Sequence, residues 1–293
     1  MKRIITIMVA FIVLLFTSNI NTMAAERRDW SNNNPKEFYN EYDYIVAVRS
    51  TPRTEMEEKG ASSEELDLIY SDHAEKEMLR RASLSGEELS EVYQYSSAQI
   101  SILRGYKGTP IEKTPQLRSV MASISGSFSP VIYNSTMAGM MLSWQWSTLP
   151  ITMVTDAVAI AWEATYANGG NNNMLLNLTE SYAQITYKPS SNGTPHFVNI
   201  NADSTNMYHG AFVTFPFVSP SGYGYAYKGF LYAEVSLANP SGPQMVDLVA
   251  NAQYAHYTYT PSSLSVSFLG DLAISFSGTS QIVLNKNLHI SMQ

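Results

Sequence analysis

The stretch from Thr136 to Tyr166 constrains the fold of this chain more than any other segment. It reads TMAGMMLSWQWSTLPITMVTDAVAIAWEATY and carries two charges, Asp156 and Glu163. Three of the four tryptophans lie in it, namely Trp144, Trp146 and Trp162. A run this apolar has to be buried in protein, in lipid or against a ligand.

Large and small side chains alternate in the second half of this stretch. The large ones, which share one face of an extended chain, are Val158, Ile160, Trp162 and Tyr166. The opposite face is mostly alanine, and a helix would scatter the same large groups around its axis. We therefore predict two strands, about 140–146 and 153–166, at the centre of a β-sandwich.

Charged residues are concentrated in the first part of the chain. Residues 26–115 contain 12 lysines and arginines and 18 aspartates and glutamates, whereas residues 116–293 contain 4 and 7. The first part is typical of solvated helices, and the second has to be covered mainly by Ser, Thr, Asn, Gln and Tyr. Neither part is basic, so the electrostatic footprint of a nucleic-acid-binding protein is missing and we exclude that role.

Residues 1–25 have the three-part layout of a secretory signal peptide. Lys2 and Arg3 precede an uncharged, mostly apolar run, 4–16, and a polar stretch then ends in Ala24 and Ala25. The run is shorter than the ~20 residues that span a bilayer. We expect cleavage after Ala24 or Ala25, export of the protein, and no permanent membrane span.

The chain contains no cysteine. Disulfides and thiol chemistry are therefore excluded, and an exported protein of this kind has to rely on its hydrophobic core for stability. Such a composition fits a bacterial secreted protein better than an animal one.

A small helical module is predicted ahead of the sandwich. After a polar lead-in, 26–54, serine occurs three times with Glu or Gln three residues later, which is the pattern of a helix-capping box. These pairs are Ser62 with Glu65, Ser85 with Glu88, and Ser96 with Gln99. We predict three or more short helices within 55–106, and a linker at 107–116, where two prolines end helices.

The remaining residues, 117–293, have the pattern of an all-β domain. Segments of period-two alternation recur at roughly 8–12 residue spacing, with turn signals between them. No βαβ alternation occurs, so a nucleotide-binding α/β fold is excluded. The predicted fold is thus α+β in sequence order, a small N-terminal helical module followed by a mainly antiparallel β-sandwich of eight to ten strands.

Motifs for metal binding, phosphate binding or a serine nucleophile are missing from the sequence. The five histidines are scattered, no His-Glu-x-x-His or Gly-x-Ser-x-Gly occurs, and the Gly-rich segments lack the lysine of a phosphate loop. We expect no metal and no cofactor. Glu163 and Glu234 are the best candidates for the carboxylate pair of a retaining glycosidase. The alternative places both on the solvent faces of edge strands.

Aromatic side chains provide the better lead to a ligand. Tyrosine alternates with small residues at Tyr223, Tyr225 and Tyr227, and a second aromatic-rich strand carries Tyr254, Tyr257 and Tyr259. Rings exposed in a row form stacking surfaces for sugars or other flat ligands. These six tyrosines are the predicted ligand contacts, and the alternative is that they pack inside the sandwich.

The sequence favours an exported, non-enzymatic binding or structural protein. Its partner is expected to be an extracellular polymer, surface or protein, and the low charge also favours self-association. A β-pore-forming toxin is the second hypothesis, with Thr179–Lys188 and Ser263–Ser277 as inserting strands and Trp144 and Trp146 as interfacial anchors. A glycan-active enzyme is the third.

Overall fold

The fold is known from a computed structural model, which describes residues 39–58, 61–169, 176–188, 193–202, 209–257, 266–269, 272–276 and 280–292. The predicted signal peptide, 1–25, lies outside the described residues. So do the first part of the lead-in and Tyr259.

The N-terminal part is helical, and three of its helices start at the predicted serines. The helices are α2 Glu41–Arg49, α3 Arg53–Glu58, α4 Ser63–Tyr70, α5 His73–Ser83, α6 Gly86–Glu91 and α7 Ser97–Gly105. Ser62, Ser85 and Ser96 each accept a hydrogen bond from the backbone N–H three residues later. At Ser96 the box is complete, because Gln99 also accepts from the Ser96 N–H at 2.8 Å. These helix starts are confirmed.

Helical structure extends beyond the predicted range at both ends. It begins at Glu41 rather than near 55, because the Asn40 side chain caps α2 by accepting the N–H groups of Tyr42 and Asp43. The segment expected as a linker holds two 3-10 turns, η1 Ile111–Lys113 and the start of η2 Pro115–Ser119. Ile111 is fully buried, so this segment packs on the helices. None of the described helices is long and apolar enough to cross a membrane.

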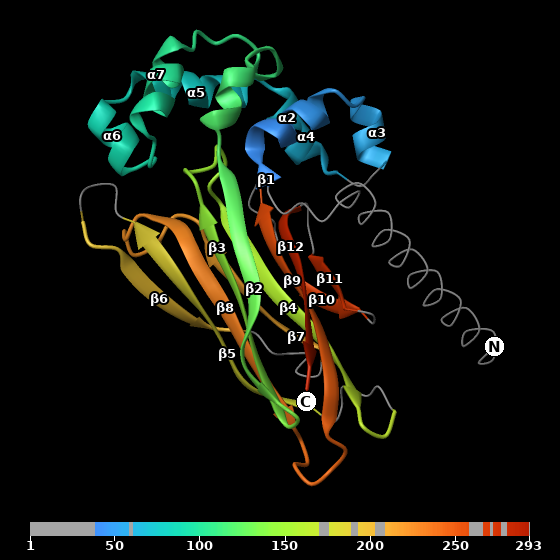
Figure 1. The fold of residues 1–293 in the computed structure, drawn as a ribbon. Coiled ribbons are helices and arrows are strands. Elements are labelled where there is room, and N and C mark those ends of the chain that lie inside the picture. The colour runs from blue at the N-terminus through green and yellow to red at the C-terminus, as the bar shows by residue number, and fades with distance from the viewer. Residues whose placement is uncertain are drawn as a thin grey trace, which may run out of the picture.

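Two larger antiparallel sheets form most of the rest of the described part (Figure 1). The six-stranded sheet has the order β1 Tyr39–Asn40, β2 Ser123–Asn134, β3 Met137–Trp146, β8 Tyr225–Leu237, β5 Leu176–Lys188 and β6 His196–Asn201. The four-stranded sheet has the order β12 Ser280–Ser291, β9 Met245–Tyr257, β4 Thr155–Tyr166 and β7 Gly210–Pro216. A hairpin, β10 Val266–Leu269 and β11 Ala273–Phe276, completes the set. The mainly antiparallel β architecture is confirmed, with eleven strands after residue 117 in the described part.

The predicted apolar stretch lies at the centre of the core. Trp144 of β3 stacks on Phe215 of β7, with ring centroids 5.8 Å apart, and meets Tyr254 of β9 edge-on at 5.2 Å. These contacts join the two sheets. The predicted alternation in β4 is confirmed, because Val158, Ile160 and Trp162 belong to this core, whereas the alanine face packs against β10 and β11. Small side chains on that face let the hairpin approach closely.

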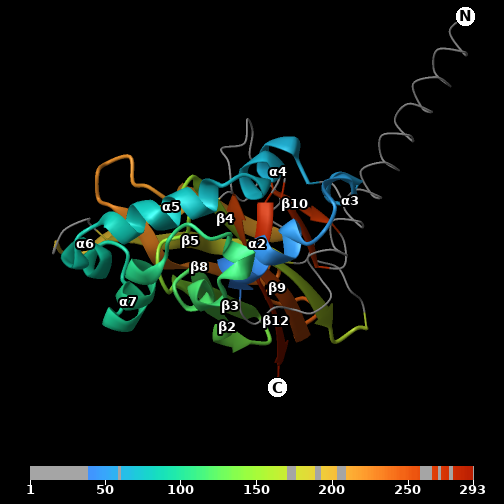
Figure 2. The same cartoon turned by 90° about the horizontal axis from the view of Figure 1, so that it is seen from above.

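The helices cover one end of the sandwich, as Figure 2 shows from above. They dock on the loop that joins β3 to β4. Arg81 of α5 donates to the backbone oxygens of Leu149 at 2.8 Å and Pro150 at 2.7 Å. The Glu41 side chain accepts from the backbone N–H of Ile151 at 2.8 Å. Because all of these groups are buried, the helices and the sandwich share one core.

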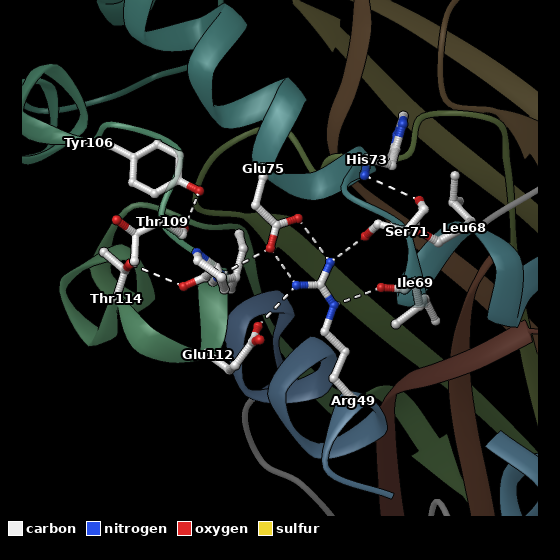
Figure 3. A network of polar contacts seen from close by, with 12 residues as sticks. Arg49, Leu68, Ile69, Ser71, His73, Glu75, Tyr106, Thr109, Glu112 and Thr114 are labelled. Atoms are coloured by element: carbon white, nitrogen blue, oxygen red, sulfur yellow. Dashed lines mark hydrogen bonds and ion pairs between the residues drawn. The ribbon is translucent and has the colours of Figure 1, made fainter. Parts of the chain in front are cut away.

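Arg49 ties four helical segments together (Figure 3). Its guanidinium donates to the backbone oxygens of Ile69 and Ser71 at 2.7 and 2.6 Å, and to the carboxylates of Glu75 and Glu112. Partial burial alone would raise the pKa of Glu75, but the Arg49 hydrogen bond lowers that pKa below its ordinary value. Arg49 therefore holds α2, α4, α5 and η1 in their relative positions.

Replacing Arg49 by alanine is expected to lower the free energy of unfolding by about 1.5–3 kcal/mol, the range for a hydrogen-bonded charged group. Urea unfolding followed by circular dichroism measures this. Arg118→Ala is the control, because Arg118 pairs with Asp43 on the surface and solvent screens that pair. We expect the control to unfold like the wild type, and equal losses in both variants would contradict the role of Arg49.

Candidate functional site

The outer face of the six-stranded sheet carries outward side chains from five strands. Residues paired directly across an antiparallel ladder project to the same side, so the register arranges them in rows across the sheet. Row 1 is Ser125, Gln145, Lys228, Thr186 and Phe197; row 2 is Ser127, Ser143, Phe230, Gln184 and Asn199; row 3 is Ser129, Met141, Tyr232, Tyr182 and Asn201. We call these three rows the open face. The helices sit at the end of the sandwich, clear of it (Figure 1).

Rows 1 and 2, apart from Asn199, line a depression of about 530 Å³. Phe197 is 63% exposed beside it, and Lys228 is the one charged residue among the described residues that line it. Its other lining side chains are aromatic, amide or hydroxyl groups. The volume falls within the range of small-molecule sites, ~300–1,000 Å³. The depression can therefore hold part of a polar ligand.

The floor of the depression is anchored in the core. Gly229 and Gly126 flank Trp144 on the inward side of the sheet. A Cβ at residue 229 would lie 2.7 Å from the Trp144 ring, so glycine is needed for the ring to fit. Because Trp144 stacks on Phe215 of the other sheet, the floor is held rigidly.

Hydrogen bonds within the rows hold several polar side chains in place. Gln184 donates to the Asn199 side-chain oxygen at 3.0 Å, and the Ser127 and Ser143 hydroxyls are 2.9 Å apart. An amide that is already oriented loses less conformational entropy when a ligand binds. Each amide retains further donors and acceptors, which suits recognition of hydroxyl groups.

Three rings form an aromatic cluster beside the depression. Tyr182 lies between Phe230 and Tyr232, with centroid distances of 5.8 and 5.6 Å. All three side chains are half-buried on the outer face. Such a group offers a continuous ring surface to a ligand that crosses rows 2 and 3.

Tyr232 is fixed flat against the sheet. A Cβ at Gly139 would lie 2.6 Å from the Tyr232 hydroxyl, so the ring leans over the glycine. The hydroxyl donates to Glu234 at 2.7 Å, and Thr179 donates to the other oxygen of the same carboxylate at 2.9 Å. Burial, together with the Glu234 hydrogen bond, raises the pKa of Tyr232.

The first predicted tyrosine row is divided by the fold. Tyr223 precedes β8 and stacks on His196, with centroids 4.3 Å apart, and neither residue lines the depression. Tyr225 is half-buried at the helical end. Tyr227 is the extra residue of a β-bulge, because Thr186 pairs with Lys228 and Tyr187 with Ala226. The bulge breaks the alternation that predicted a continuous row.

The second predicted row is buried. Tyr254 lies between the sheets and Tyr257 lies under β10 and β11, and neither has exposed surface. A ligand in solvent cannot reach them in this fold, so the alternative of packing inside the sandwich holds for both. Trp144 and Trp146, expected as interfacial anchors of a pore-forming protein, are buried as well.

The expected carboxylate pair is not formed. Glu163 projects from the outer face of the four-stranded sheet, and Glu234 from the outer face of the six-stranded sheet. Two packed sheets are ~10 Å apart, whereas the carboxyl groups of a retaining glycosidase are ~5 Å apart. Glu163 and Glu234 are therefore not brought together as a pair, because the sequence does not reveal which sheet each strand joins. Both lie on outer faces, as the alternative had it, but β4 and β8 are interior strands rather than edge strands.

A buried acid–histidine pair was not foreseen. His256 Nδ1 lies 2.7 Å from Asp156, which also accepts from Tyr254, and His256 Nε2 lies 3.2 Å from the Thr152 hydroxyl. Burial alone would lower the pKa of His256, but Asp156 more than offsets this and raises it. With at most 1% exposure, the pair is out of reach of a substrate and serves the structure. No group of three potential metal ligands occurs in the described part.

Comparisons with known proteins identify no family for this chain. No family model matches the chain, and no curated protein matches its sequence. The macrocyclization catalyst AvmM of alchivemycin A biosynthesis is 7% identical over 58% of this chain and 88% of its own, with a TM-score of 0.29. A cohesin module of a Clostridium perfringens family 33 glycoside hydrolase is 7% identical over 57% and 96%, with a TM-score of 0.28.

A third similar structure is the collagen-binding subdomain of an Enterococcus faecalis surface protein. It is 9% identical over 57% of this chain and 95% of its own, with a TM-score of 0.29. Similarity at this level carries no information on activity or ligand. The description as an antiparallel β-sandwich capped by helices comes from the structure of the chain itself. The function has to be argued from the open face.

Proposed function

We propose that the protein is an exported, non-enzymatic binding protein that holds an extracellular polymer, surface or partner protein against its open face. The observation that carries this proposal is the depression lined by Phe197, Phe230, Gln184 and Lys228, on a sheet face that none of the described helices covers. It combines ring surface with oriented amides in a concave site.

The proposal of export rests on the expected signal peptide at 1–25. The proposal of a binding role fits the side chains of the open face, which form no catalytic arrangement. The two expected glutamates lie on opposite sides of the molecule, and the acid–histidine pair is buried. Surfaces rich in tyrosine, serine and asparagine bind through adaptable hydrogen bonds and large ring contacts.

The proposal predicts that the exported protein binds at least one of insoluble cellulose, chitin, peptidoglycan or a collagen-coated surface. Phe197→Ala is expected to weaken that binding roughly tenfold, the equivalent of one aromatic contact. Co-sedimentation or plate binding with the purified protein measures the effect. Tyr133→Ala is the matched control, because Tyr133 is 52% exposed but lies outside the depression.

Two results would count against this function. One is that the purified protein binds none of these surfaces. The other is Phe197→Ala binding as tightly as both the wild type and Tyr133→Ala, which would place the contact elsewhere.

A further inference from the structure

We infer that the ligand of the open face is a neutral glycan chain, which runs along β8 from Lys228 toward Glu234 across the aromatic cluster. This inference rests on the proposed function and specifies its ligand. Three properties of the face carry it, namely its length, the position of its charges and the fixed ring of Tyr232.

The outward side chains of β8 form a line with charge only at its ends. Lys228, Phe230, Tyr232 and Glu234 alternate along the strand, so the line spans ~20 Å at about 3.4 Å per residue. Rows 2 and 3 contain no charge between these ends. A line of this length requires an extended ligand rather than a single small molecule.

The two ends of the line carry opposite charge, so a chain with one sign along its whole length meets repulsion at one end. Glu180 pairs directly with Glu234, so a polyanion would meet two carboxylates at that end. A polycation would meet Lys228 at the other end, next to the depression. A neutral chain meets neither repulsion and can still accept a hydrogen bond from Lys228 and donate one to Glu180.

The arrangement of rings and amides matches the two kinds of surface on a sugar. Tyr232 leans over Gly139 and is held by Glu234, so its ring is laid along the sheet instead of standing upright. Ring faces take the apolar C–H side of a sugar, and the amides of Gln145, Gln184 and Asn199 take its hydroxyl edges.

A protein partner fits the same face less well. Among the fifteen side chains of rows 1 to 3, Met141 is the one large aliphatic group. The centres of protein–protein interfaces are more apolar and exclude water. Protein binding is therefore the competing outcome of the experiment.

Isothermal titration of the exported protein with linear glucose, N-acetylglucosamine, xylose and mannose oligosaccharides tests this inference. Affinity for at least one series is expected to rise with chain length until the ~20 Å line is filled. Galacturonic acid oligosaccharides are expected to bind at least tenfold more weakly.

Tyr232→Ala and Gly139→Ala are each expected to weaken binding roughly tenfold, the second because its Cβ displaces the Tyr232 ring. Tyr133→Ala should bind like the wild type.

The outcomes separate the ligand from the general function. If no oligosaccharide binds but collagen does, and Phe197→Ala weakens collagen binding, the function stands and the glycan inference is overturned. Equal affinity for neutral and acidic chains, or no length dependence, also overturns it. Unfolding curves of Tyr232→Ala and Gly139→Ala show whether each variant is folded. If a variant does not fold, the dependence of wild-type affinity on oligosaccharide length tests the inference.

Discussion

Replacing Arg81 by methionine is expected to lower the free energy of unfolding by about 3–5 kcal/mol, the range for removing one partner of a buried charge network. Arg81 has no exposed surface, and its guanidinium bonds to Glu77, to the Tyr95 hydroxyl and to two backbone oxygens of the β3–β4 loop. Methionine keeps most of the volume, so the loss reports unpaired polar groups rather than a cavity.

The neighbouring arginine provides a matched control. Arg80 pairs with the same Glu77, but its side chain is 48% exposed. Arg80→Met is therefore expected to cost no more than about 1 kcal/mol, because solvent screens the pair. Urea unfolding followed by far-UV circular dichroism compares the variants. Similar losses at both positions would show that burial of Arg81 between the helices and the sandwich does not stabilise the protein.

The elements of this fold could largely be predicted from local patterns. Ser62, Ser85 and Ser96 start helices because a capping side chain acts within one turn of chain. The alternation of β4 could be read because it repeats every two residues. The helix at Glu41 was missed because its cap, Asn40, stands in a polar, Asn-rich segment that also fits a loop.

The site could not be predicted in the same way, because it depends on strand order. Phe197, Phe230 and Tyr182 come from β6, β8 and β5, and only the register brings them to one face. Tyr254 and Tyr257 have the same local pattern as an exposed row, but β9 is a central strand whose two faces are both covered. The bulge at Tyr227 likewise arises from pairing with β5.

Substitution in the buried pair of Asp156 and His256 is expected to have the second large effect on the free energy of unfolding. We expect His256→Gln to lower the free energy of unfolding by about 3–5 kcal/mol near pH 6, because the substitution leaves a buried carboxylate without its charged partner. These residues are 100 positions apart and hold β4 to β9 beneath the helices. Glu41 also faces His256, and burial, as the largest cause, raises the pKa of Glu41 above its ordinary value.

The raised pKa of His256 fixes the direction of the pH dependence. The native state holds this proton more tightly than the unfolded state, so its contribution is fully present below pH 6.5 and is lost as the pH rises through the folded value. The raised pKa of Glu41 acts in the same direction above 4.5. Wild-type stability should therefore decrease as the pH rises above 6.5, and His256→Gln should remove most of that slope.

The surface pair of His289 and Asp247 is the control, because it has the same two side chains as the buried pair but lies in solvent. Its side chains lie 3.1 Å apart, like a second copy of the buried pair, but His289 is 61% exposed. Urea unfolding at several pH values should show that His289→Gln keeps both the stability and the pH slope of the wild type. If His256→Gln kept the wild-type slope, His256 would not be the group that releases a proton to solvent on unfolding, and the ionised pair could not be what joins β4 to β9.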